Sequence, residues 1–395
     1  MLIDFHKSRS NRQRILQQMN TFAQEPRTAL GSGRSALCSF ILAASVAIWI
    51  ASFVHAQPLR SSGQQSGGGV VQRIKVHGAS LEANLEGDSP DRDVAVYLPP
   101  SYATAHKRRY PVLYLLHGYG RTVEGWVPFI DLLGSADRDI ASGAAKEMIV
   151  VIPDANTLYG GSMYSSSPTT GNWEAYITRD LVAYIDGHYR TIAKRESRGL
   201  AGHSMGGYGA WRIAMKYPEL YASVYGLSAC CLMNSPRHPA EGRTPARPAR
   251  AAPALNANND QGHGHPVNIQ YGEAAAWSPN PTNPPLFFDL PVKDGQFQPS
   301  IAAKWIANSP LAMVDQYVPN MKKYRAIAMD CGLQDPLLAS NKEFDEALTR
   351  LGIQHTFETF EGEHSDRLKD RIEQKVLPFF SSNLEFPNDR PSRKR

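Results

Sequence analysis

Short apolar segments alternate with helical segments along most of this sequence. The segment 111–118, PVLYLLHG, is apolar almost throughout, which is typical of a strand buried on both faces of a parallel sheet. Apolar residues at helical spacing predict a long helix over 172–189. Further strands are expected at 94–100, 147–154, 197–203, 221–229, 324–330 and 354–360, and further helices at 206–218, 341–352 and 366–380. This alternation predicts an α/β fold with a mostly parallel central sheet and helices on both faces.

The N-terminal region resembles an export signal. An uncharged apolar stretch, 36–54, follows a basic segment and is followed by a small residue at Ala56. We expect residues 1–56 to be a signal peptide cleaved after Ala56, which would make the protein periplasmic or secreted. The alternative is an N-terminal anchor that stays in the membrane, because the stretch is just long enough to span a bilayer.

The rest of the chain is expected to form one folded domain. A flexible Gly/Ser/Gln-rich linker is expected over 57–69, the domain over 70–384 and a polar tail over 385–395. A segment rich in Pro, Ala and Asn, 235–299, is too long for an ordinary connection and is interpreted as an insertion. Its His263 and His265 could bind a metal, but no third ligand is evident, so we interpret them as solvated loop residues and expect no metal.

The charge balance argues against a nucleic-acid partner. The chain has 42 Lys and Arg residues against 37 Asp and Glu residues, a formal net charge of +5. Most of the basic excess lies in the first 56 residues, so the domain itself is close to neutral. A nucleic-acid-binding domain would be expected to carry a basic excess of its own.

Three of the four cysteines lie outside the leader. Cys230 and Cys231 follow the predicted strand 221–229, and Cys331 follows the predicted strand 324–330. If these two strands are neighbours, Cys230 or Cys231 could reach Cys331 to form a disulfide. The alternatives are three buried free thiols, or a bridge between Cys230 and Cys231 themselves.

The motif GHSMG at 202–206 lies between a predicted strand and a predicted helix. This is the sequence pattern of a nucleophile elbow, in which a serine sits on a strained turn and both flanking glycines are needed because side chains there would collide. Ser204 is therefore the candidate nucleophile. His203 is interpreted as structural, because alternation along the strand should point its side chain elsewhere.

Two backbone amides are expected to face the same point as Ser204. One is the N–H of Met205, at the start of the following helix, where the helix dipole favours a developing negative charge. The second should come from the loop 117–122, HGYGRT, with Tyr119 preferred over Gly120. His117 is interpreted as a residue that orients this loop.

The order Ser, acid, His along the chain identifies the other two candidates. His364 follows the predicted strand 354–360 and so shares a sheet edge with Ser204, whereas His355 starts that strand and lies at the opposite edge. Asp330 and Asp335 both follow the strand 324–330. Asp335 is preferred, because it has the extra chain needed to reach sideways to His364.

Five segments together carry a family resemblance: GLAGHSMGGYGAW, LYLLHGYGRT, NWEAYITRDLVAYID, DCGLQDPLLASNKEFDEAL and FEGEHSDRL. They resemble the putative-esterase family of α/β-hydrolases, which includes esterase D (S-formylglutathione hydrolase), tributyrin and feruloyl esterases, and the antigen 85 mycolyltransferases. The resemblance spans about 94–384 and implies a catalytic triad of Ser204, Asp335 and His364. The chain departs from many members at 365–367, where they carry an acid and a tryptophan, and in the insertion.

The sequence therefore predicts an exported serine carboxylesterase that needs no cofactor and forms an acyl-enzyme. Its expected partner is a small-molecule or carbohydrate-linked ester. The alternatives are an acyltransferase of the mycolyltransferase type, a thioesterase similar to S-formylglutathione hydrolase, and a binding module that kept the fold without activity.

Overall fold

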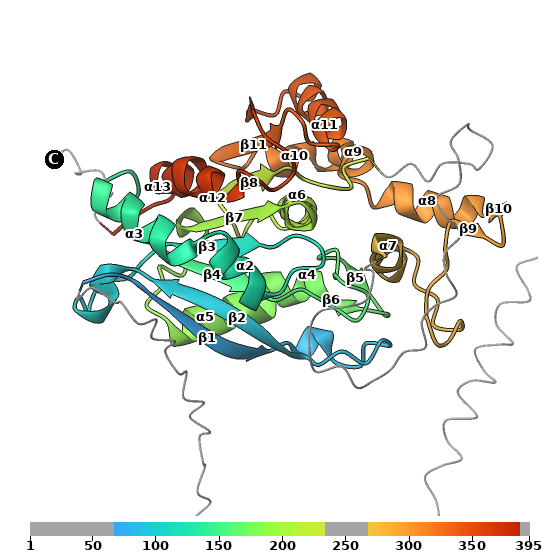
Figure 1. Ribbon diagram of the computed structural model, residues 1–395, viewed down its shortest axis with the longest axis horizontal. Helices are drawn as coiled ribbons and strands as arrows, with labels where there is room; N and C mark the ends of the chain where they lie inside the picture. The colour runs from blue at the N-terminus through green and yellow to red at the C-terminus, as the bar shows by residue number, and fades with distance from the viewer. Residues whose placement is uncertain (1–66, 234–267, 388–395) are drawn as a thin grey trace, which may run out of the picture. The chain divides into compact units, whose positions relative to one another are not determined.

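An eight-stranded sheet lies at the centre of the protein (Figure 1). The computed structural model describes residues 67–233 and 268–387. The strand order is β1-β2-β4-β3-β7-β8-β11-β12, with β1 and β2 antiparallel to their neighbours and the other pairs parallel. The predicted mostly parallel sheet is thus confirmed. The strands are β1 (Val70–His77), β2 (Asp91–Leu98), β3 (Val112–Leu116), β4 (Ile149–Pro153), β7 (Arg198–His203), β8 (Ser223–Leu227), β11 (Ala326–Gly332) and β12 (Thr356–Phe360).

Helices cover both faces of this sheet, which explains why every residue of the central strands β3, β4, β7 and β8 is buried. One face packs against apolar side chains of α5, α6 and α11, and the other against those of α2, α3 and the α12–α13 segment (Figure 1). The helices are α2 (Val123–Phe129), α3 (Leu132–Ser142), α4 (Trp173–Ala175), α5 (Leu181–His188), α6 (Met205–Lys216), α7 (Ile269–Trp277), α8 (Pro299–Ala307), α9 (Pro310–Met313), α10 (Val318–Met321), α11 (Leu338–Arg350), α12 (Leu368–Arg371) and α13 (Leu377–Asn383).

The long helices expected over 172–189 and 366–380 each contain a π-helical turn. These turns are Tyr176–Asp180, between α4 and α5, and Ile372–Val376, between α12 and α13. Strand β1 is absent from the expected elements. Its sequence, VVQRIKVH, mixes charged and apolar residues because it lies at the edge of the sheet, where several of its side chains face solvent.

The described part of the insertion is more regular than its composition suggests. Helix α7 lies within 235–299, as does a short hairpin of β9 (Val292–Lys293) with β10 (Gln296–Phe297). A second short hairpin, β5 (Ser166–Ser167) with β6 (Gly171–Asn172), comes earlier in the chain, and neither hairpin belongs to the main sheet. The Trp277 ring at the end of α7 is buried, with its centroid 5.4 Å from that of Tyr208 and 5.5 Å from that of Trp305. The insertion thus contributes to the core beside α6.

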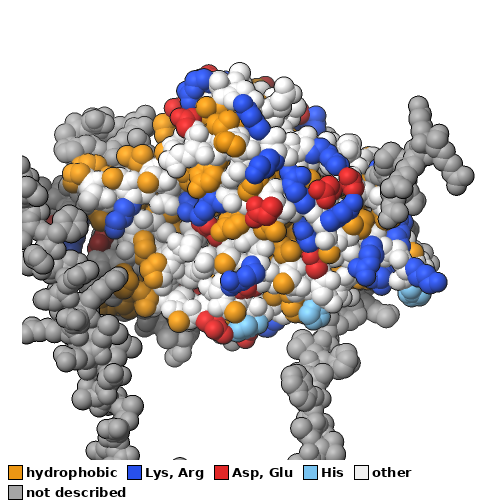
Figure 2. Space-filling model, turned by 180° about the vertical axis from the view of Figure 1, so that it is seen from behind, with side chains coloured by type: hydrophobic (Ala, Val, Ile, Leu, Met, Phe, Trp, Pro, Cys, Tyr) orange, Lys and Arg blue, Asp and Glu red, His pale blue; other side chains and the backbone are white. Residues whose placement is uncertain are grey.

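Several predictions fall outside the described residues: the leader 1–56, most of the linker 57–69, and the pair His263 and His265. Among the helices that the structure describes, none has the length and apolar character needed to cross a membrane. On the face shown in Figure 2, basic and acidic side chains are interspersed rather than separated by sign.

Candidate active site

Ser204 occupies a strained turn between β7 and α6. Its φ of 56° and ψ of −115° are unusual for a residue with a side chain. The turn leaves no room for side chains at the flanking positions: a Cβ at Gly202 would overlap the backbone of Gly206, and one at Gly206 would overlap the carbonyl of Leu116. The elbow geometry predicted from GHSMG is therefore present, and it presents the Ser204 hydroxyl at the carboxyl end of β7.

We expect Gly206→Ala to destabilise the fold by roughly 3 kcal/mol or more, because the new methyl group would overlap backbone atoms rather than a movable side chain. Gly187→Ala is the matched control: it lies in α5, and its added Cβ would meet nothing within 4 Å. The control should be neutral or stabilise the protein by up to about 1 kcal/mol. Thermal unfolding of both variants checks this, and equal stabilities would contradict the crowded elbow.

Three side chains from different strand ends form one hydrogen-bonded row. His364 Nε2 lies 2.9 Å from Ser204 Oγ, and His364 Nδ1 lies 2.9 Å from Asp335 Oδ2. The Asp335 side chain is fully buried, and its other oxygen accepts the N–H of Leu337 at 2.8 Å. Burial alone would raise the pKa of Asp335, but the hydrogen bonds from His364 and Leu337 lower it below its usual value. Asp335 is thus held as a carboxylate that fixes the orientation of the imidazole.

Asp330 does not reach this row. It is buried within an ion-paired cluster, where its Oδ2 accepts hydrogen bonds from Tyr225 Oη and Arg371 Nε, both at 2.9 Å. Arg371 also pairs with Glu358 on β12 at 3.1 Å. Of the two acids that the sequence offers, the structure therefore places Asp335 against His364 and gives Asp330 a packing role.

The backbone N–H groups of Tyr119 and Met205 donate no hydrogen bond within the described part of the chain. Met205 is the first residue of α6, so its N–H has no partner within the helix. Gly120, the alternative to Tyr119, donates its N–H to the carbonyl of Gly160 at 2.8 Å. The backbone bonding therefore favours Tyr119 over Gly120 as the available donor.

Two histidines beside the row hold the surrounding loops. His203 Nε2 lies 2.8 Å from the carbonyl oxygen of His364, and burial lowers the pKa of His203 to about 3, so it donates this hydrogen bond as a neutral ring. His117 bonds the Gly118 carbonyl through Nδ1 and accepts the N–H of Ala155 at Nε2, both at 2.8 Å. Each histidine thus joins two segments that are distant in sequence.

Helix α7 supports the Tyr119 loop, a contact that no sequence pattern predicts. The Tyr119 hydroxyl donates to the carbonyls of Tyr159 and, at 3.2 Å, of Asn268. A Cβ at Gly272 would lie 2.6 Å from the Tyr119 ring, so the helix packs closely on it. Glu273 follows, with one oxygen 3.6 Å from Cys231 Sγ. No motif marks these residues, and the composition of the insertion obscures the helix.

The three cysteines in the described part of the chain are free. Strands β8 and β11 are neighbours, as predicted, but a bridge from Cys230 or Cys231 to Cys331 is not formed. Instead, Cys331 Sγ lies 3.9 Å from Ser228 Oγ, while the sulphur atoms of Cys230 and Cys231 lie 2.6 Å apart.

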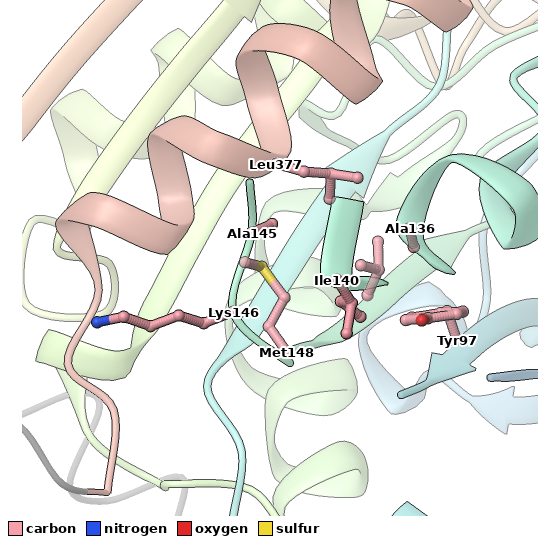
Figure 3. Close-up of a pocket in the computed structure, with 8 residues that line it drawn as sticks. Tyr97, Ala136, Ile140, Ala145, Lys146, Met148 and Leu377 are labelled. Atoms are coloured by element: carbon pink, nitrogen blue, oxygen red, sulfur yellow. The ribbon is translucent and has the colours of Figure 1, made fainter. Parts of the chain in front are cut away.

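A small cavity elsewhere offers no competing site. It has a volume of about 10 Å³ and lies between α3 and the sheet, lined by Tyr97, Ala136, Ile140, Ala145, Lys146, Met148, Val150 and Leu377 (Figure 3). This space holds at most one water molecule. Within residues 67–233 and 268–387, no three His, Cys, Asp or Glu side chains gather as metal ligands would.

A family model described as "Putative esterase" matches residues 89–368 of this chain. The chain belongs to the putative-esterase family. The match includes Ser204, Asp335 and His364, and it confirms the family resemblance of the five sequence segments.

Curated relatives are similar over part of their length. An esterase of Mycobacterium tuberculosis is 40% identical over 135 residues, which cover 33% of this chain and 27% of the relative. An endo-1,4-beta-xylanase/feruloyl esterase of Xylanibacter ruminicola is 36% identical over 132 residues, covering 32% and 18%. An S-formylglutathione hydrolase of Paracoccus denitrificans is 30% identical over 148 residues, covering 33% and 49%. This chain therefore spans less than half the length of each of these relatives.

Solved structures agree with the fold over most of the described chain. A ferulic acid esterase has a TM-score of 0.56 at 24% identity, covering 80% of this chain and 99% of that protein. An S-formylglutathione hydrolase of Staphylococcus aureus has a TM-score of 0.54 at 17% identity, covering 79% and 99%. The α/β-hydrolase fold predicted from the sequence is thereby confirmed.

Proposed function

We propose that the protein is a serine carboxylesterase whose catalytic triad is Ser204, His364 and Asp335. The observation that carries the proposal is the unbroken row of hydrogen bonds from Ser204 Oγ through His364 to the buried Asp335 carboxylate. Membership of the putative-esterase family supports the same chemistry.

Each member of the row has one role in the proposed reaction. His364 Nε2 removes the hydroxyl proton as Ser204 Oγ attacks the ester carbonyl, and Asp335 stabilises the resulting imidazolium. The tetrahedral intermediate collapses, the alcohol leaves with the proton from His364, and an acyl-enzyme remains on Ser204. Water, deprotonated by His364, then attacks the acyl group and releases the acid.

The oxyanion of the tetrahedral intermediate is proposed to accept hydrogen bonds from the N–H groups of Met205 and Tyr119. The α6 N-terminus adds the positive end of its dipole at the same place. Neither amide requires a conformational change to become available, because neither is bonded within the described chain. This arrangement stabilises negative charge that is present only during the reaction.

Gly272→Ala is expected to lower kcat about 10-fold or more, because the added methyl group would push the Tyr119 ring and shift its amide. Gly187→Ala should leave kcat unchanged. Ester hydrolysis under saturating substrate checks this prediction. Unchanged kcat in a correctly folded Gly272→Ala variant would show that the contact between Gly272 and the Tyr119 ring does not set the position of the Tyr119 amide.

The proposed substrates are carboxylic esters, including hydroxycinnamate esters such as ferulates. The partial similarity to a feruloyl esterase makes these compounds the first to test. Export is proposed on the basis of the uncharged segment 36–54 alone. The N-terminal sequence of the secreted protein would test cleavage after Ala56.

The decisive experiment combines active-site labelling with a substrate panel. A fluorophosphonate should label Ser204 covalently, and p-nitrophenyl and feruloyl esters should be hydrolysed. Absence of labelling in a folded protein would indicate a binding module without activity. Formation of a new ester when an acceptor alcohol is present would favour transfer of the mycolyltransferase type, and preference for thioesters would favour an S-formylglutathione hydrolase-like activity.

A further inference from the structure

Two adjacent cysteines follow β8 next to the nucleophile. The N–H of Cys230 donates to the carbonyl oxygen of Ser204 at 3.1 Å, and the sulphur atoms of Cys230 and Cys231 lie 2.6 Å apart. Cys231 has a φ of 60°, in the left-handed region that residues with side chains seldom adopt. The turn therefore holds both thiols on the same side of the chain.

The two thiols differ in their access to reagents. Cys230 is buried with 6% of its surface exposed, whereas Cys231 is partly exposed. Cys331, near the end of β11, lies apart from them, against Ser228 directly after β8. Cys231 is the more exposed residue of the pair, so we assign it the first reaction with a reagent and Cys230 the second.

Glu273 supplies an acceptor for the Cys231 proton. Its Oε1 lies 3.6 Å from Cys231 Sγ, and no Lys or Arg in the described part of the chain forms a salt bridge with it. Burial raises the pKa of Glu273 to about 7, so the carboxyl can gain or lose a proton near neutrality. Hydrogen bonding to Cys230 and burial raise the pKa of Cys231 well above its usual value, so this thiol needs such a base to become a nucleophile.

We infer that Cys230 and Cys231 form a redox site that closes into a disulfide between neighbouring residues when it meets a small-molecule disulfide. Glu273 takes the Cys231 proton, and the thiolate attacks one sulphur of the reagent, breaking its S–S bond and releasing one thiolate. That thiolate takes up the proton of Cys230. The Cys230 thiolate then attacks Cys231 Sγ and displaces the second thiolate, which is protonated from Glu273. Two protein thiols are oxidised, and one reagent disulfide is reduced to two thiols.

The test uses the full chain and 2-hydroxyethyl disulfide. After treatment, remaining thiols are alkylated under denaturing conditions and the protein is digested with trypsin. The sequence places Cys230 and Cys231 together in the peptide 217–237 and Cys331 in the peptide 326–342, so the two sites separate cleanly. We expect the first peptide to lose the mass of two hydrogen atoms and to resist alkylation, the second to be fully alkylated, and 2-mercaptoethanol to reverse the change.

Three variants sharpen the result. Cys331→Ser should leave closure unchanged, and Cys230→Ser should stop at a mixed disulfide on Cys231. Glu273→Gln should slow closure about 10-fold or more, since the base is removed while the side chain keeps its size. Circular dichroism checks that each variant folds.

Four outcomes would overturn the inference. These are a stable reagent adduct on Cys231 in the unaltered protein, a crosslink between the two peptides, full alkylation of all three cysteines, and closure of Glu273→Gln at the original rate. The readout is independent of ester hydrolysis, so it remains informative if the proposed function fails.

Discussion

Ser204→Ala is expected to lower kcat by about 10⁴-fold or more while leaving the protein folded. Only Oγ is lost, and it is the atom that His364 contacts at 2.9 Å. Alanine keeps the Cβ of serine, so the strained turn at φ 56° gains no further strain. Steady-state hydrolysis of a p-nitrophenyl ester and thermal unfolding together check the prediction.

A fluorophosphonate provides the control for this variant, because it should label the unaltered protein and leave Ser204→Ala unlabelled. Near-normal hydrolysis by the alanine variant would show that another group carries the reaction. Loss of folding together with activity would leave the comparison uninformative, so the unfolding temperature must stay close to that of the parent protein.

Asp335→Asn is expected to lower kcat about 10⁴-fold, because an amide in place of the carboxylate favours the wrong tautomer of His364. Stability should change little, since Asn can still accept the N–H of Leu337. Asp330→Asn is the matched control. It should cost roughly 3 kcal/mol of stability by breaking the buried pair with Arg371, yet the folded fraction should keep its kcat.

These two variants should separate an active-site acid from a packing acid five positions away in sequence. Measuring kcat per folded molecule and urea unfolding for both variants gives the comparison. If Asp330→Asn lost activity while Asp335→Asn lost only stability, the roles drawn from the hydrogen bonds would be reversed.

The sequence predicted best those residues whose position follows from the direction of the strand before them. Ser204, Asp335 and His364 each follow a parallel strand, and the carboxyl ends of parallel strands lie at one edge of the sheet, so their proximity could be predicted. Rejection of His355 followed from the same rule, and the structure pairs it with Asp345 at 2.7 Å instead.

Residues whose environment depends on tertiary packing were harder to predict. The preference for Asp335 over Asp330 as the catalytic acid rested on loop length. The structure adds a physical reason, because Arg371 on the distant helix α12 pairs with Asp330 and neutralises its charge. Helix α7 and the contact between Glu273 and Cys231 left no signal in the sequence, because an Ala-rich segment within a Pro- and Asn-rich stretch has no clear apolar period. Strand β1 was not among the expected strands, although its Val and Ile residues and the alternation of buried Ile74 and Val76 with exposed Lys75 and His77 are typical of a half-buried strand.

The packing of α7 on Tyr119 limits how much of the insertion can be removed from an engineered chain. A design that removed the whole insertion up to residue 299 would discard Gly272 and Trp277, and with them the packing against Tyr119 and part of the core beside α6. A shortened chain should therefore retain the sequence from Asn268 onward. Substitutions within α7 would act on the Tyr119 loop, while the three strand ends that carry Ser204, Asp335 and His364 would stay untouched.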